Sequence, residues 1–273
     1  MMMVSVIMIT YGHEAYVKKS IEMILQQECD FDFELLIAND CSPDRTDDII
    51  IELLSIHPKA EKVKYFKHDK NLGMMANSLF AMNLASGKYV ALCEGDDYWT
   101  DKLKLQLQVD FLENNLDYVM CFHAVNVETT QGAEGYVYPL PRKDTLFLKD
   151  IIRNHYIPTC SLMYRNFTLE NGYPDWMLNS ISGDIPLEIL LSAHGKTKYM
   201  PIKMACYLRN PGGISHSPKQ LEKMRLGYIF MYNKLLQELG YVKGYYLIYK
   251  IARLIGGGVK NKVLNFFLLT NRI

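Results

Sequence analysis

The sequence lacks a net charge, a paired-cysteine motif and a long apolar run, and each absence excludes a class of protein. Thirty basic residues balance thirty acidic ones, so no global field favours a nucleic-acid partner, and we expect none. The six cysteines form no CxxC pair and no zinc-like spacing, which is typical of free thiols in a reducing compartment. No stretch approaches the roughly 20 apolar residues of a membrane span, and the N-terminus lacks the basic start of a signal peptide. The sequence therefore predicts a cytoplasmic protein.

The first half of the chain alternates between strand-like and helix-like segments. "VSVIMIT" is a continuous apolar run rich in β-branched residues, as in a strand that is buried on both faces. The same reasoning gives strands at 4–10, 33–40, 62–68, 88–94 and 117–125, and helices at 14–27, 43–54, 73–86 and about 105–112. Strand–helix repetition with short connections predicts an α/β fold, an open, mostly parallel twisted sheet with helices on both faces.

The regular alternation ends near residue 125. A loop-rich stretch with at most a short strand follows, then strands at 158–164 and 197–208, a helix at 184–194 and a long helix at 218–239. We expect one α/β domain over residues 1–217 and a C-terminal helical extension over residues 218–273. Ser42 and Pro43 are suited to the start of the second helix, as its cap and first turn.

Polar side chains gather where the predicted strands end. The segment "ALCEGDDYW" places Glu94, Asp96 and Asp97 directly after the strand at 88–94, and Asp40 follows the strand at 33–40. The carboxyl ends of parallel strands meet at one edge of a sheet, where ligands bind. Carboxylates this close repel, so water, a basic side chain or a metal ion must offset them. Because no phosphate-binding P-loop is present, the sequence predicts an acidic cleft that holds Mg²⁺ or Mn²⁺ on a phosphorylated ligand.

Five segments in order resemble the signatures of the family 2 glycosyltransferases. They are "VSVIMITYG", "FELLIANDCSPDRT", "NLGMMAN", "ASGKYVALCEGDDYW" and, more loosely, "GDIPLEILLSAHGK". Members of this family are inverting enzymes with the nucleotide-diphospho-sugar transferase fold called GT-A. The resemblance implies a nucleotide-binding half at 1–120, an acceptor-binding half at 121–217, and a metal-dependent transfer of sugar from a nucleotide-sugar donor, with a UDP-sugar expected.

The resemblance also implies roles for individual residues. Asp96 falls at the DxD position that coordinates the metal, and Asp184 falls where the family has its general base. The donor-binding positions implied by the resemblance are Thr10, Tyr11, Glu14, Asp40, Asn71, Asn77, Glu94, Asp96 and Asp97. Two departures matter: Glu94 replaces the first aspartate of DxD, and "YLRNPGGISHS" has Asn210 where many relatives have a histidine, with His216 six residues later.

Each of these positions also has a purely structural explanation. Asp96 and Asp97 could be turn residues ahead of a helix capped by Thr100, and Asp40 could form an Asx-turn. Asp184 could be a helix N-terminal acid stabilised by the helix dipole, in which case Glu188 or Asp175 would be the base. Glu14 and Asn77 could lie on helix surfaces.

The C-terminal segment has its own charge pattern. After Glu238 the chain contains six basic residues and no acidic one, mixed with aromatic and aliphatic residues. This composition suits a helix on an anionic membrane surface, and equally a helix that packs on the domain with its basic side in water. The first interpretation would place the protein peripherally on the cytoplasmic face of the inner membrane, near a lipid-linked acceptor.

Taken together, the sequence predicts a metal-dependent inverting glycosyltransferase that transfers a sugar to a glycan or a lipid-linked polysaccharide precursor. A second interpretation is a catalytically inactive sugar-nucleotide-binding subunit of a membrane-associated assembly. A nucleotidyltransferase on a similar sheet is a third, although "TYGHEAY" is not the glycine-rich basic loop that such an enzyme would need after its first strand.

Overall fold

The computed structural model describes residues 2–129, 132–139, 141, 143–154, 157–166, 172–209 and 218–256. Asn210, His216 and residues 257–273 lie outside these ranges, so the structure does not test the predictions made for them.

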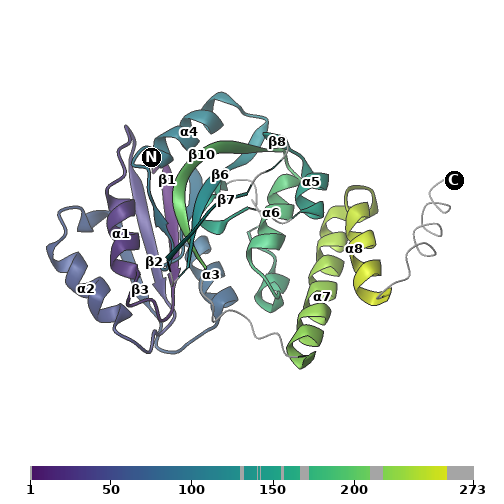
Figure 1. Ribbon diagram of the computed structural model, residues 1–273, viewed down its shortest axis with the longest axis horizontal. Helices are drawn as coiled ribbons and strands as arrows, with labels where there is room; N and C mark the ends of the chain where they lie inside the picture. Colours follow the sequence, from purple (N-terminus) through teal and green to yellow (C-terminus); the bar gives the residue numbers. More distant parts are fainter. Residues whose placement is uncertain are drawn as a thin grey trace.

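The core of the molecule is one mixed, mostly parallel sheet (Figure 1). Its strands lie in the order β3-β2-β1-β4-β9-β6-β10-β5, with β7 paired to β6 and β8 paired to β10. β3, β2, β1 and β4 are parallel, β9 runs antiparallel to β4 and β6, and β6 is parallel to β10. The strands are β1 (Val4–Thr10), β2 (Phe33–Asn39), β3 (Val63–Lys67), β4 (Tyr89–Leu92), β5 (Tyr98–Trp99), β6 (Tyr118–Thr129), β7 (Gly132–Tyr138), β8 (Thr145–Leu146), β9 (Met163–Arg165) and β10 (Lys196–Arg209).

Helices cover both faces of this sheet, as predicted. The α-helices are α1 (Val17–Leu25), α2 (Thr46–Ile56), α3 (Met74–Asn83), α4 (Lys104–Asn114), α5 (Leu148–Arg153), α6 (Asp184–Ser192), α7 (Pro218–Lys243) and α8 (Tyr245–Gly256). Short 3-10 helices lie at η1 (Ala60–Lys62), η2 (Thr159–Ser161) and η4 (Asp175–Asn179). α1, α2 and α4 pack on one face, and α3 with α5 to α8 packs on the other.

The strands at the centre are mainly apolar because both of their faces are covered. All seven residues of β2 are buried. Leu36 and Ala38 point into the core beneath α3, whereas Leu35 and Ile37 point into the core beneath α1 and α2. This alternation follows from the two-residue period of a strand, and it places the carboxyl ends of β1, β2 and β4 together at one edge.

Local predictions failed where side chains compete with the backbone for hydrogen bonds. α2 begins at Thr46 rather than near Pro43, because Asp44 Oδ1 accepts hydrogen bonds from the backbone and hydroxyl of Thr46. The Asx-turn forms at Asn39, whose Oδ1 accepts from Ser42, and not at Asp40. Thr100 caps no helix, since α4 begins only at Lys104.

Two segments after residue 125 also differ from the prediction. The expected loop forms a hairpin, because β6 runs to Thr129 and pairs with β7. The expected strand at 158–164 is divided into η2 and the short strand β9.

The C-terminal helices pack against the domain at the end of the molecule away from α1 and α2 (Figure 1). α7 contains a kink at Gly240, whose φ of 70° lies in the left-handed region that favours glycine. Leu247 of α8 is fully buried, and α8 contacts both α7 and α5. Residues 245–256 therefore form a packed helix, and within the described ranges no helix is both long and apolar enough to cross a membrane.

A buried lysine at the start of α4 leads us to expect an unusual dependence of the free energy of unfolding on pH. Lys104 is completely buried; its Nζ donates to Gln108 Oε1 at 2.7 Å and lies 4.0 Å from the centre of the Trp99 ring. Burial disfavours the ammonium form and lowers the pKa of Lys104 from 10.5 to about 8. Folding at neutral pH must therefore bury a charge.

We expect Lys104→Met to raise the free energy of unfolding at pH 7 by about 1–3 kcal/mol, given about 1.4 kcal/mol per pKa unit and the loss of the Gln108 hydrogen bond. Between pH 8 and 10.5 the unfolded lysine keeps a proton that the folded lysine has lost. Because the unfolded state then binds more protons, the free energy of unfolding of the wild type rises with pH through this range. The penalty is therefore full below pH 8 and shrinks as the pH rises towards 10.5, where the advantage of the variant disappears.

Urea unfolding at pH 7 and pH 10 measures this, with Lys102→Met, whose side chain is 61% exposed, as the control. A variant that is less stable than wild type at both pH values would refute the prediction.

Candidate active site

A pocket of about 270 Å³ opens at the carboxyl ends of β1, β2 and β4. Seven of the ten residues predicted for the site line this pocket: Thr10, Tyr11, Asp40, Asn71, Asn77, Glu94 and Asp96. Ile9, His13, Gly73 and Met74 complete the lining. Residues from four separate segments thus meet at the edge that the strand order predicted.

Asp40 connects the strand edge to the loop before α3. Its side chain is buried, and its two carboxylate oxygens accept hydrogen bonds from the backbone amides of Leu72 and Gly73 at 2.7 and 2.9 Å. Each carboxylate oxygen has a further lone pair. Asp40 can therefore hold this loop in place and still accept a hydrogen bond from a ligand in the pocket.

Asn77 is a buried part of the same wall rather than a helix-surface residue. Its amide nitrogen donates to the carbonyl of Ala38 at 2.9 Å, and its Oδ1 lies 3.0 Å from His68 Nε2. Because both ends of the amide are bonded within the protein, Asn77 fixes the position of α3 against β2.

Negative charge concentrates on the wall formed after β4. Glu94 is half-buried, and burial, followed by the charges of Asp97, Asp96 and Asp184, raises its pKa to about 8. Asp96 Oδ2 lies 3.9 Å from His13 Nε2. A cation bound here would relieve the repulsion that raises the pKa of Glu94.

Asp97 faces away from this pocket. It is buried, and its Oδ1 accepts a hydrogen bond from the backbone amide of Leu208 in β10 at 2.8 Å. Burial, followed by the charge of Asp96, raises its pKa to about 8. Asp97 thus connects the acidic segment to β10 through a hydrogen bond, and it does not line the pocket with the other predicted donor-binding residues.

Glu14 also lies outside the pocket lining. Its side chain is exposed, and its carboxylate accepts a hydrogen bond from the backbone amide of Arg45 at 2.9 Å. Glu14 thus joins the loop after β1 to the start of α2.

His13 is a pocket residue that the sequence analysis missed. Its Nδ1 lies 3.2 Å from Thr10 Oγ1, and its backbone amide donates to Thr46 Oγ1 at 2.9 Å. Its position, three residues after β1 ends at the edge of the sheet where ligands bind, could have indicated a pocket residue.

Asp184 begins α6 and is exposed to solvent. The Ser182 hydroxyl donates a hydrogen bond to its Oδ1. Asp184 does not line the pocket itself, but its negative charge contributes to the raised pKa of Glu94. The alternative base Glu188 is fully buried, and burial followed by the Asp184 charge raises its pKa well above the usual value. Asp175, the other alternative, is exposed at the start of η4.

The residues present fit a divalent metal that is shared with a diphosphate. No group of three histidine, cysteine or carboxylate side chains gathers as a metal cage in the described part of the chain. Mg²⁺ and Mn²⁺ need only one or two protein carboxylates when phosphate oxygens and water supply the other ligands. Asp96 is partly exposed on the pocket wall, and Glu94 is beside it.

An acidic pocket at the carboxyl edge of a mixed, mostly parallel sheet is the architecture of the GT-A class of nucleotide-sugar transferases. The family described as "Glycosyl transferase family 2" matches residues 5–170. An uncharacterized protein of Mycobacterium tuberculosis is 34% identical over 214 residues, which cover 78% of this chain and 60% of that protein. The chain belongs to glycosyl transferase family 2, as predicted, and it spans about 60% of the length of this relative.

Solved structures confirm the predicted fold. Residues 1–349 of Staphylococcus aureus TarS, in complex with UDP-GlcNAc, superpose with a TM-score of 0.71 at 18% identity, covering 97% of this chain and 78% of that one. The mannosyltransferase PcManGT from Pyrobaculum calidifontis, in complex with GDP-Man and Mn²⁺, gives 0.57 at 12% identity, covering 98% and 78%. At these identities the likeness establishes the GT-A fold alone.

Gly95 is required by the close packing of the pocket wall. A Cβ at this position would lie 2.6 Å from Thr10 Oγ1 and 2.8 Å from His13 Nδ1. We expect Gly95→Ala to displace both side chains, lower the free energy of unfolding by about 1–3 kcal/mol, and, under the donor role proposed below for this pocket, weaken the binding of UDP.

Gly195→Ala is the matched control, because its Cβ would lie 2.7 Å from Val119 Cγ1, and neither residue lines the pocket at the strand ends. Urea unfolding and UDP titration calorimetry should show a similar loss of stability in both variants but a loss of UDP binding only in Gly95→Ala. Equal UDP affinities in the two variants would contradict the assignment of this wall to the donor site.

Proposed function

We propose that the chain is a metal-dependent inverting glycosyltransferase that transfers a sugar from a nucleotide-sugar donor, a UDP-sugar, to a hydroxyl of a glycan or a lipid-linked polysaccharide precursor. The observation that carries the proposal is the pocket in which Thr10, Asp40 and Asp96 meet from the ends of three parallel strands. TarS, with the same fold, is described in complex with UDP and with UDP-GlcNAc, which supports UDP as the nucleotide.

The nucleoside would lie in the part of the pocket nearest β1 and β2. The Tyr11 ring is 48% exposed at the pocket edge and is available to stack on a base. Asp40 is held rigidly by the amides of Leu72 and Gly73, so its free lone pairs have a fixed direction for an imide N–H. Asn71 lies in the same loop and would close over the nucleotide.

Asp96 would hold Mn²⁺ or Mg²⁺ on the diphosphate; PcManGT is described with Mn²⁺. When bound, the metal would neutralise the negative charge on the departing nucleoside diphosphate. The longer side chain of Glu94 would reach the sugar or ribose.

Asp184 would act as the general base. Its exposed carboxylate is oriented by the Ser182 hydroxyl and can take the proton of an acceptor hydroxyl. That oxygen would attack the anomeric carbon from the face opposite the leaving group. A single in-line displacement inverts the anomeric configuration, so an α-linked donor would give a β-linked product.

We also propose that the protein works in the cytoplasm, peripherally at the membrane surface. α8 is packed on α5 and α7, yet Tyr245, Tyr249 and Ile255 are each at least 45% exposed. Exposed aromatic and aliphatic side chains beside basic residues are suited to the interface of an anionic bilayer.

Titration calorimetry of UDP, GDP and a panel of UDP-sugars, with and without Mn²⁺, tests the proposal together with a transfer assay. We expect UDP to bind at least about tenfold more tightly with Mn²⁺, and one UDP-sugar to be consumed. If no nucleotide binds, the pocket is not a donor site. If UDP-sugars bind but no acceptor or water consumes them, the chain is a sugar-nucleotide-binding subunit and the proposed activity is wrong.

A further inference from the structure

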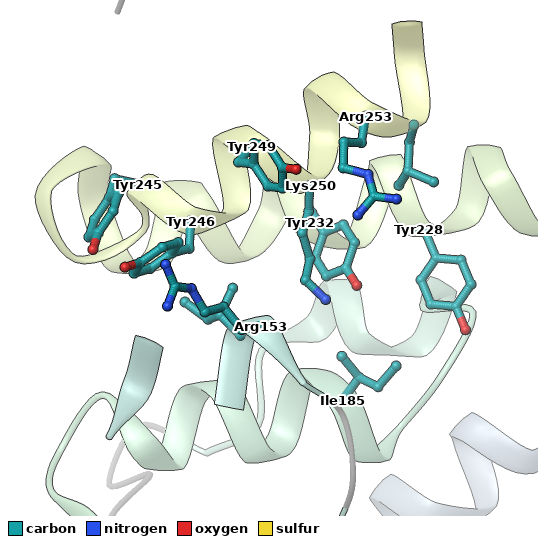
Figure 2. Close-up of a pocket in the computed structure, with 11 residues that line it drawn as sticks. Arg153, Ile185, Tyr228, Tyr232, Tyr245, Tyr246, Tyr249, Lys250 and Arg253 are labelled. Atoms are coloured by element: carbon teal, nitrogen blue, oxygen red, sulfur yellow. The ribbon is translucent and has the colours of Figure 1, made fainter. Parts of the chain in front are cut away.

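A second, larger pocket of about 980 Å³ lies between α8 and the layer formed by α5, α6 and α7 (Figure 2). Tyrosine rings dominate its walls: Tyr228, Tyr232, Tyr245, Tyr246 and Tyr249. None of its described lining residues belongs to the donor pocket described above.

The charged residues of this second pocket are all basic. Arg153, Lys250 and Arg253 line it, and no acidic residue is among its described lining. Figure 2 shows the three cationic side chains extending into the space between the helices, Arg153 from α5 and the other two from α8. The Arg153 guanidinium lies 4.2 Å from the centre of the Tyr246 ring. Burial and the charge of Arg253 lower the pKa of Lys250, as expected where cations are held close together.

The rest of the wall is apolar. Ile152, Ile185 and Leu254 contribute aliphatic surface beside the faces of the tyrosine rings. An inorganic anion would leave the apolar surface without a contact, and a neutral lipid would leave the cationic side chains without an anionic partner. The combination therefore fits a molecule with an anionic group and an apolar body.

The position of the second pocket relates it to the proposed reaction. Ile185 lines the pocket and directly follows Asp184 on α6. The negative charge of Asp184 also contributes to the raised pKa of Tyr228, another lining residue. A molecule bound between α7 and α8 would therefore lie next to the proposed general base.

We propose that this pocket holds the acceptor, and that the acceptor is an amphiphile with a phosphate group on an apolar chain. The phosphate would bind Arg153, Lys250 and Arg253, the chain would lie against the tyrosine rings, and a hydroxyl of the molecule would reach Asp184. The assignment of the ligand as acceptor rests on the function proposed above. The last residues of this chain do not fit as the occupant, because Lys260, Lys262 and Arg272 would add positive charge to a basic pocket.

Titration calorimetry with farnesyl monophosphate, below its micelle concentration, tests the pocket directly. We expect saturable binding, with inorganic phosphate and farnesol each at least about tenfold weaker. Arg253→Glu should weaken the binding of farnesyl monophosphate at least about tenfold and leave the affinity for UDP unchanged. Lys102→Glu is the matched control, an exposed charge reversal outside both pockets, and it should alter neither. Circular dichroism would confirm that both variants are folded.

The possible outcomes separate this inference from the proposed function. If UDP binds and farnesyl monophosphate does not, the acceptor assignment is wrong while the donor site stands. If farnesyl monophosphate binds no better than inorganic phosphate, the pocket is a simple anion site and the inference fails. If only vesicles of phosphatidylglycerol bind, and Arg253→Glu removes that binding, the surface recognises a bilayer rather than a single acceptor, and the inference is again wrong. If farnesyl monophosphate binds but no nucleotide does, the proposed function falls and the acceptor role falls with it.

Discussion

Replacing Asp184 with asparagine is expected to lower kcat for sugar transfer by about 10²–10⁴-fold, the usual contribution of a general base. Asparagine has nearly the same shape, and its side-chain oxygen can still accept the hydrogen bond from Ser182, so the start of α6 should be preserved. The amide cannot, however, take a proton from the acceptor hydroxyl. Because Asp184 lies outside the lining of the donor pocket, the affinity for UDP should stay within about threefold of wild type, a shift below about 0.7 kcal/mol.

Initial rates at saturating donor and acceptor, with calorimetric titration of UDP, would measure the two effects separately. Asp175→Asn is the control, since Asp175 is also an exposed acid at the start of a helix and should keep full activity. Glu188→Gln should also retain most of the activity, because the buried Glu188 carboxyl is not accessible to an acceptor hydroxyl. A large loss of kcat in Glu188→Gln with little loss in Asp184→Asn would move the base to Glu188.

The parallel half of the fold was predictable because its sequence signals are local. The strands at 4–10, 33–40 and 88–94 are mainly apolar runs of a length typical of buried strands, the strand at 62–68 alternates lysines with apolar residues, and the helices between them show apolar stripes. The parallel order then placed Thr10, Asp40 and Asp96 at one edge without any knowledge of side-chain positions. For this reason seven predicted residues meet in one pocket although they come from distant parts of the sequence.

What failed depends on contacts that sequence spacing does not encode. Asp96 and Asp97 are neighbours, yet in the turn after β4 one faces the pocket and the other accepts a hydrogen bond from Leu208. For Asn77 it is the helix-surface alternative that was wrong, because the approach of α3 to β2 buries its side chain. The basic tyrosine-lined pocket could not be predicted from the sequence, because its lining comes from four helices. The basic residues after Glu238 predict only a membrane-surface helix or a helix packed on the domain.

Asp96→Asn is the second substitution with a large expected effect. We expect UDP binding in the presence of Mn²⁺ to weaken by about tenfold or more, down to the affinity measured without Mn²⁺, because a neutral amide replaces one of the one or two carboxylates on which such a metal site relies. Binding of UDP without Mn²⁺ should change little, since the nucleoside contacts proposed for Tyr11 and Asp40 remain. Removing one negative charge should also let the pKa of Glu94 fall, as the Asp96 charge is one of the causes of its rise.

Asp97→Asn is the matched control, because it makes the same chemical change one residue along the chain. The amide oxygen introduced at this position could still accept the hydrogen bond from Leu208, so the fold of the segment should be kept. Calorimetric titration of UDP with and without Mn²⁺ on both variants gives a direct comparison. If Asp97→Asn removes the metal dependence and Asp96→Asn does not, the metal lies on the buried side of the turn, and the pocket at the strand ends loses its proposed role. If only Asp96→Asn removes the metal dependence of UDP binding, then Asp96, which faces the pocket, binds the ion, and Asp97, which faces β10, holds the segment in place.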